Sequence, residues 1–415
     1  NNTEEKELVK GCMNSNANNF NANATEEDNT CDYDLDDDGV LDADEILGCT
    51  DSTANNYNAE ATEVDNTCDY DLDDDGTLDA DEILGCTDST ANNYNAEATE
   101  EDNTCVFIFQ PQTKDELKTA VDEWIEDSDS ANSTYGEINT WDTSLITDMQ
   151  ELFYETPFNG DISDWDVSSV TNMYGMFSNA ESFNQPLSDW DVSSVTNMAV
   201  MFASADSFNQ PLSGWDVSSV TDMEWMFAYA ENFNQDISEW DVSSVTAMNQ
   251  MFGYAENFNQ DISDWDVSSV TDMVYMFAYA YEFNQDISDW EVSSVTDMGD
   301  MFSNAESFNQ DISDWDVSSV TDMVYMFAYA DSFNQDISSW DVSSVTNMYG
   351  MFYAADDLSD DNKCAIHSSF SSNDNWQYEW EEYCPEPFQP ETKDELQTAV
   401  DEWIDDSDSA NSTYG

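Results

Sequence analysis

The chain has 415 residues, and its 93 Asp and Glu residues against six Lys and no Arg give it a formal net charge of −87 at pH 7. It is therefore not expected to bind nucleic acid, whose phosphates are held by Lys and Arg. No run of residues approaches the roughly 18 apolar positions of a membrane span, so direct membrane insertion is not expected either.

The first region, residues 1–105, repeats with a period of 37 residues, and each unit begins at a Gly-Cys pair. The second Cys of each unit follows 19 residues after the first. An even set of regularly spaced cysteines without short Cys-x₂₋₄-Cys pairs favours disulfides in an oxidising compartment over zinc. The simplest pairing lies within units, as Cys12–Cys31, Cys49–Cys68 and Cys86–Cys105. Pairing across units, as Cys31–Cys49 and Cys68–Cys86, stays open.

Two of these units contain a twelve-residue loop that fits the EF-hand calcium pattern at every ligand position. Calcium takes about six to eight oxygen ligands, here carboxylates and one backbone carbonyl, and a glycine permits the sharp turn. The predicted ligands are Asp34, Asp36, Asp38, Val40, Asp42 and Glu45 in the first loop, and Asp71, Asp73, Asp75, Thr77, Asp79 and Glu82 in the second. The alternative is a pair of solvated acidic loops. We expect Ca²⁺ to rigidify a stalk that has little core.

No entering helix fits before the first loop, because only Cys31-Asp32-Tyr33 precedes it, counted from the second cysteine of the unit. The loops are therefore more similar to dockerin or thrombospondin-type calcium loops than to paired EF-hands.

Residues 106–140 are expected to form a helical cap. Thr113 and Glu116 have the spacing of a capping box, and an apolar face follows from Leu117 to Ile125, so we predict a helix over 113–126. The segment Phe109–Gly136 returns as Phe388–Gly415, so residues 385–415 are interpreted as the start of a second copy of the cap. We also expect the chain to be an excerpt of a longer precursor.

Residues 141–352 repeat with a period of 25 residues, which is typical of a solenoid. In one unit, Ile262, Trp265 and Val267 have the spacing of a leucine-rich-repeat strand. The apolar residues that follow lie at helical spacing after a possible N-cap at Ser269, namely Val270, Met273, Met276, Phe277 and Ala280. We therefore predict an α/β solenoid whose unit is a short strand plus a short helix, with the Trp and Met columns in the core. A recurring Asn, such as Asn259, is expected to bond the turn backbone.

Residues 353–384 are predicted to form the C-terminal cap, closed by a disulfide between Cys364 and Cys384. The solenoid itself contains no Lys, Arg or His, and an acidic residue follows each Trp, as Asp266 follows Trp265. Two interpretations of this acidic column stay open. Each Asp accepts hydrogen bonds from the turn after it, or pairs such as Asp264 and Asp266 gather cations or a basic partner.

The 25-residue unit resembles the BspA-like leucine-rich repeat surface proteins, the DUF285 repeat family, in its motif Trp-Asp-Val-Ser-Ser-Val-Thr-x-Met-x-x-Met-Phe. The resemblance covers roughly residues 109–384 and implies a secreted or surface-anchored, often adhesive protein without a catalytic site. The Gly-Cys-Thr-Asp-Ser-Thr-Ala-Asn-Asn-Tyr units resemble modules of long secreted proteins of marine Bacteroidota.

We therefore predict a structural or adhesive segment of a long, calcium-stabilised extracellular fibre or cell-surface appendage, which self-associates as a homo-oligomer. The alternative is a cell-surface module that binds a host, prey or glycan ligand on the solenoid face, where Trp225 and Tyr281 interrupt the repeat pattern. Catalysis is not expected, because the single histidine, His367, lies in the C-terminal cap and no Ser-His-Asp or Cys-His arrangement can be built elsewhere.

Overall fold

The computed structural model describes residues 8–34, 39–70, 81–384 and 389–405. The chain divides between Phe107 and Ile108 into two compact units, two residues after the boundary expected from the sequence. Each unit is described by itself.

The first unit consists of three modules, and each module holds one pair of very short parallel strands. β1 (Lys10–Gly11) pairs with β2 (Glu26–Glu27), β3 (Leu47–Gly48) with β4 (Glu63–Val64), and β5 (Leu84–Gly85) with β6 (Glu100–Glu101). The disulfides are Cys12–Cys31, Cys49–Cys68 and Cys86–Cys105. The cysteines are thus paired within units, so each module has its own disulfide.

Each module has almost no apolar core. In the second module the buried apolar residues are Cys49 and Ala54. The glycine before the cysteine is required by close packing, because a Cβ on Gly48 would lie 3.2 Å from both the Asn58 amide nitrogen and the Ala61 Cβ. Asn58 in turn donates its backbone N–H to the Cys49 carbonyl at 2.9 Å. The recurring Gly-Cys and Asn therefore belong to one local packing unit around the disulfide.

The second unit begins with a helical cap made of α1 (Lys114–Glu126), α2 (Ser128–Tyr135) and the 3₁₀ turn η1 (Ile138–Thr140). The Thr113 hydroxyl accepts the Glu116 backbone N–H at 3.2 Å, which is the predicted N-cap. Leu117 and Val121 are fully buried in the same core cluster as Trp141. The predicted cap helix is thus confirmed, and it covers the first coil of the repeats.

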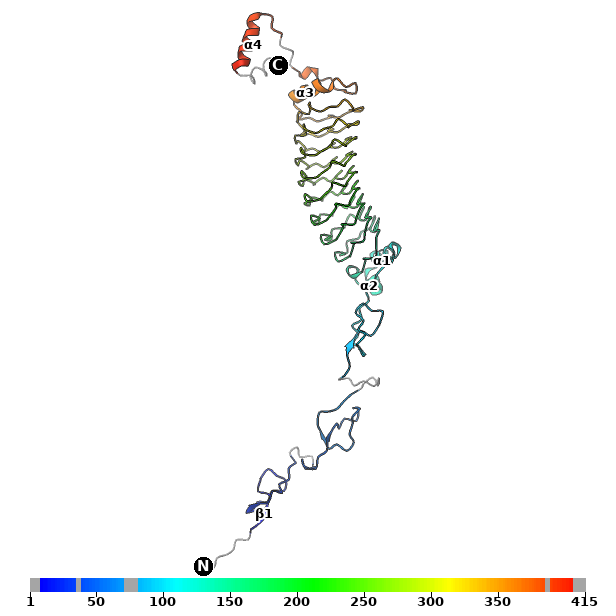
Figure 1. Ribbon diagram of the computed structural model, residues 1–415, viewed down its shortest axis with the longest axis vertical. Coiled ribbons are helices and arrows are strands. Elements are labelled where there is room, and N and C mark those ends of the chain that lie inside the picture. The colour runs from blue at the N-terminus through cyan, green and yellow to red at the C-terminus, as the bar shows by residue number, and fades with distance from the viewer. Residues whose placement is uncertain (1–7, 35–38, 71–80, 385–388, 406–415) are drawn as a thin grey trace, which may run out of the picture. The chain divides into compact units, whose positions relative to one another are not determined.

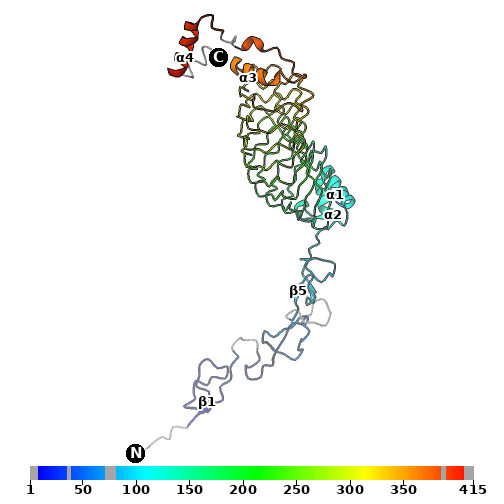
Figure 2. The ribbon, with the colours of Figure 1, turned by 45° about the horizontal axis from the view of Figure 1, so that its top comes forward.

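The 25-residue units follow as coils that stack one on the next, and we call residues 141–358 the repeat stack. Figure 1 shows the coils between α1 and α2 at one end and α3 at the other, and the turned view of Figure 2 shows the same order. Parallel bridges connect each coil to the next from Asp148 to Asn347. Among the described residues 141–358, no α-helix and no continuous strand occurs.

The strand-plus-helix prediction for each unit is therefore wrong in its backbone. The predicted strand around Trp265 consists of turns, with the Trp265 N–H donating to the Ile262 carbonyl at 3.2 Å. The hydrogen bonds that join the coils lie instead in the segment predicted to be a helix. The N–H of Tyr275 donates to the Gly299 carbonyl of the next coil at 3.0 Å, and every second residue after Tyr275 in that segment donates to the next coil in the same way.

The physical reason is a left-handed residue at every fourth position of this segment. Tyr275 and Tyr279 have φ of 57° and 59°, which an α-helix does not permit. The segment becomes a row of tight turns, such as the one closed by the Met276 N–H and the Met273 carbonyl at 3.2 Å. These turns bury the same apolar positions as the predicted helix, so the burial pattern was right although the backbone was not.

Columns of identical side chains fill the interior of the stack. The Trp265 ring is 3% exposed, and its Nε1–H donates to the Ile237 carbonyl of the preceding coil at 3.1 Å. Phe252 and Phe258 stack within one coil with ring centroids 3.8 Å apart. The methionines of the stack are all fully buried. The prediction that the Trp and Met columns are core is confirmed.

The C-terminal cap consists of α3 (Asp360–Phe370) and the 3₁₀ turn η2 (Glu381–Tyr383), joined by the disulfide Cys364–Cys384. A further helix, α4 (Lys393–Asp405), repeats the sequence of α1 with two changes. Its Leu396 is 49% exposed, whereas the equivalent Leu117 of α1 is fully buried. No helix in the described part of the chain combines the length and the apolar character that crossing a bilayer would need.

Candidate functional site

The first predicted calcium loop is closed by hydrogen bonds around its glycine. Gly39 has a φ of 95°, and its N–H donates to the Asp34 carboxylate at 3.1 Å. The Asp42 N–H donates to the Tyr33 carbonyl at 2.7 Å, which brings the ninth position of the loop back to the residue before its start. The glycine thus makes the turn that the pattern assigned to it, and the first predicted ligand bonds to that turn.

A single turn after the loop carries its last predicted ligand. The Glu45 N–H donates to the Leu41 carbonyl at 3.1 Å, and the chain then enters β3 without forming a helix. Of the predicted ligands, Asp34, Val40, Asp42, Glu45 and Glu82 belong to the described residues. The others lie outside them, namely Asp36, Asp38, Asp71, Asp73, Asp75, Thr77 and Asp79.

The acidic column beside the tryptophans is held by the turns that follow it. The Asp266 carboxylate accepts the Ser268 N–H at 3.1 Å, and the same contact recurs in the neighbouring coils, as between Asp241 and Ser243. Hydrogen bonds from the side chain and then the backbone of Ser268 lower the pKa of Asp266. The first interpretation of this column, local bonding to the turn, is therefore the arrangement found.

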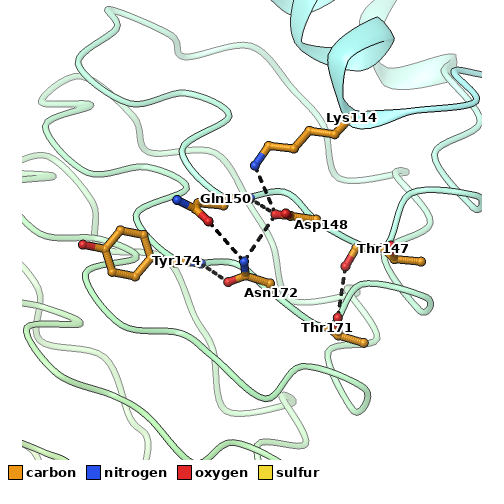
Figure 3. A network of polar contacts seen from close by, with 7 residues as sticks. All are labelled: Lys114, Thr147, Asp148, Gln150, Thr171, Asn172 and Tyr174. Atoms are coloured by element: carbon orange, nitrogen blue, oxygen red, sulfur yellow. Dashed lines mark hydrogen bonds and ion pairs between the residues drawn. The ribbon is translucent and has the colours of Figure 1, made fainter.

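A second column of Asp and Asn runs along the ladder that joins the coils. Figure 3 shows its first rungs, where the Lys114 ammonium of α1 lies 3.2 Å from the Asp148 carboxylate. The Asn172 amide of the next coil points at the same carboxylate from 3.4 Å. Lys114 therefore supplies the cation at the start of the column and ties the helical cap to the stack.

Farther along this column, carboxylates follow one another without an amide between them. Asp272, Asp297 and Asp322 occupy three consecutive coils. Burial, and then the neighbouring Asp322 and Asp272, raise the pKa of Asp297. The Asn347 amide donates to both Asp322 oxygens, at 3.1 and 2.9 Å, and ends the run.

The turn ladder carries an aromatic surface, which we call the tyrosine face, and most but not all of its rings stand at left-handed positions. Tyr229, Tyr254 and Tyr279 stack on one another with ring centroids 4.3 and 4.2 Å apart. The face continues toward both ends of the stack through Tyr154, Tyr174, Trp225, Tyr275, Tyr325, Tyr329, Tyr349 and Tyr353. It carries two cavities, of about 330 Å³ near Trp225 and about 630 Å³ near the C-terminal cap.

The larger cavity was not predicted from the sequence, although a signal for it exists. Asp300 lines it and stands at a ladder position that holds Tyr in the coils on either side, Tyr275 and Tyr325. An Asp at a position that is Tyr in the units before and after it is visible in the sequence, and it is the signal that could have pointed to this site. Burial raises the pKa of Tyr378, which also lines this cavity, to about 12.

His367 has structural partners inside the C-terminal cap. It is buried in α3, and its Nδ1 accepts the Trp376 Nε1–H at 3.0 Å. Its Nε2 lies 3.5 Å from the Glu381 carboxylate. The ring therefore joins α3 to the aromatic loop that ends at η2.

Comparison with known proteins identifies the repeats. No curated protein and no solved structure matches the chain. The family model described as "Mycoplasma protein of unknown function, DUF285" matches three times, over residues 122–230, 210–308 and 283–379, and these matches together span more than half of the chain. The matched segments are the end of α1, the rest of the N-terminal cap, the repeat stack and most of the C-terminal cap. On this evidence the chain belongs to the DUF285 family.

Proposed function

We propose that the chain is a structural or adhesive segment of an extracellular surface fibre, and that calcium stabilises the modules of its first unit. Repeated units of this family fit a structural or binding role, and four disulfides are typical of oxidising compartments. The repeat stack would act as a stiff leucine-rich-repeat-like solenoid in which a row of turns replaces the helix. Self-association is the proposed route to a fibre, and no catalytic role is proposed.

One observation carries the calcium proposal: the Asp34 carboxylate accepts the N–H of Gly39, the residue at which the loop turns. The same contact between first ligand and glycine would hold a twelve-residue calcium loop in shape. Asp42 and Glu45 follow on a closed turn, so the spacing of the last two predicted ligands is kept. A bound cation would also offset the crowding of carboxylates in a module that has little core.

The test measures thermal unfolding of the full chain in calcium and in chelator, with hydrogen exchange to assign each transition. All tryptophans lie beyond residue 107, so Trp fluorescence reports on the second unit alone. Calcium should raise the midpoint of the first unit by several degrees and leave the fluorescence transition unchanged. The double variant Glu45→Gln with Glu82→Gln should lose this response, because it removes the last ligand of both loops.

The matched control is Glu60→Gln with Glu97→Gln, since both residues are exposed, lie in the same region and stand outside the loops. It changes the net charge equally and should keep the full response to calcium. If the first unit unfolds at the same temperature with calcium and with chelator, the calcium proposal fails. Electron microscopy of native material tests the fibre separately, because isolated chains without a filament would favour a ligand-binding module.

A further inference from the structure

The cavity of about 630 Å³ near the C-terminal cap has walls made of tyrosine rings. Tyr325 meets Tyr349 edge to face, with centroids 5.4 Å apart and planes at 87°. Tyr329 meets Tyr353 in the same way at 5.3 Å and 73°. Gly350 makes this packing possible, because a Cβ there would lie 2.4 Å from the Tyr325 ring. The walls are thus fixed aromatic faces and edges.

One carboxylate in this cavity is half-buried and lacks a cationic neighbour in the lining. Burial raises the pKa of Asp300, the Tyr275 and Ser303 side chains lower it, and the neighbouring Asp322 and Asp297 raise it further. Burial is the largest cause of its raised pKa. The cavity lining contains no Lys, Arg or His, and neither does any residue from 141 to 352. The cavity therefore carries negative charge that the chain itself does not offset.

We propose that this cavity binds the side chain of an arginine presented by a different protein. A guanidinium is flat enough to stack on tyrosine faces, and its N–H groups match a carboxylate. The lining offers further acceptors in the Asn304 and Gln377 amides. Residues 1–415 contain no arginine, so the same residues of a second copy cannot supply the group.

Two other occupants fit the same walls less well. A quaternary ammonium would stack on the tyrosines but has no N–H to donate to Asp300. A neutral glycan would also stack and hydrogen-bond, but it would leave the charge of the carboxylate without a counterion. Charge complementarity with a chain of net charge −87 favours the guanidinium. The inference is independent of calcium binding in the first unit.

Calorimetric titration of the full chain with acetyl-Gly-Arg-Gly-amide tests the proposal. The solution contains 0.5 M NaCl, because salt screens the general attraction of any cation to so acidic a protein. We expect the arginine peptide to bind and its citrulline counterpart, which has the same shape without the charge, not to bind. Asp300→Asn should weaken binding by about tenfold or more, and Tyr353→Ala should weaken it several-fold.

The control variant is Asp264→Asn, which removes one exposed carboxylate beside the tryptophan column and should leave the affinity unchanged. Circular dichroism of each variant checks that the stack remains folded. Equal binding of the citrulline peptide would overturn the proposal, and so would equal losses in Asp300→Asn and Asp264→Asn. Tighter binding of cellohexaose than of the arginine peptide, lost in Tyr353→Ala, would assign the cavity to a glycan instead.

Discussion

The side-chain oxygen of Asn234 accepts a hydrogen bond at 3.0 Å from the backbone N–H of Asn259, the residue at the same place in the next coil. Gln260 donates its amide to the same oxygen at 2.9 Å. The contact repeats through the stack and ends in the C-terminal cap, where the Ser359 N–H donates to Asn334 at 2.9 Å. The predicted bonding of this Asn to turn backbone is confirmed, and each Asn serves the following coil.

Replacing one of these residues should destabilise the stack. Asn259→Ala removes the acceptor of the Asn284 N–H and of the Gln285 amide, at 3.0 and 2.8 Å. The partly buried Asn284 N–H loses its partner, and the Gln285 amide keeps only the Asn259 backbone carbonyl at 3.1 Å, so we expect a loss of about 1–3 kcal/mol in the free energy of unfolding. Urea unfolding followed by Trp fluorescence measures it. The control Asn257→Ala removes one exposed hydrogen bond, from the Asn257 amide to the Glu231 carbonyl at 2.7 Å, and leaves no buried donor without a partner. It should cost clearly less, and equal losses would contradict the proposed role of the Asn259 column.

One residue of the turn ladder is poorly suited to its backbone. Val200 has a φ of 63°, which is unfavourable for a β-branched residue. Asn tolerates this conformation, so Val200→Asn should raise the free energy of unfolding by about 1 kcal/mol. Val274 is similarly half-buried on the ladder but does not have a positive φ. Val274→Asn should therefore not stabilise the protein, and a gain in both variants would show that backbone strain is not the cause.

Stability should depend on pH in two opposite ways. The pKa of Asp216, Asp266 and Asp316 lies below the ordinary 3.8, first because serine hydroxyls donate to them. Their ionised forms stabilise the fold above pH 3.8, and this contribution is lost as pH falls through the lowered pKa values. The pKa of Asp297 and Asp300 is raised by burial. Protonation of Asp297 and Asp300 removes the cost of burying their charges. Their contribution to the free energy of unfolding therefore increases as pH falls from above toward 3.8.

We therefore expect the free energy of unfolding in 0.5 M NaCl to rise as pH falls from 7 toward 3.8, and to decline below 3.8. Urea unfolding at a series of pH values measures this. The double variant Asp297→Asn with Asp300→Asn should reduce the rise and keep the decline. An unchanged rise in that variant would assign the effect to the general charge of the surface.

Reduction of the disulfides should unfold the first unit before the repeat stack. Each bridge of the first unit closes a loop over a sequence separation of 19 residues, for which about 3 kcal/mol is typical, and little other core supports the module. Hydrogen exchange in a reducing agent should show rapid exchange in residues 8–34 and 39–70, while the amides of the stack stay protected. If the amides of the first unit stay protected after full reduction, contacts other than the disulfides hold the modules folded.

Periodicity placed the core correctly, because the same side chain in every unit must meet its own copies once the units stack. It also indicated the N-cap at Thr113, whose hydroxyl accepts the Glu116 N–H as the pattern predicts. It did not give the backbone of the unit, since the apolar spacing of a short helix and that of a row of tight turns coincide over so few residues. For the calcium loops, the structure shows the turn at Gly39, and binding itself stays a prediction.

The sequence by itself determined the number and length of the units, the residues that fill the core, and the acidic surface of the repeat stack, which has no lysine. These features follow from repetition and composition alone. Only the tertiary structure decided which segment carries the ladder, because coil-to-coil hydrogen bonds join residues about 25 positions apart, such as the Thr296 N–H and the Thr271 carbonyl. It also decided that Asp300 lies among tyrosines of the following coils. Such a site exists only where stacked coils meet, and no single unit contains it.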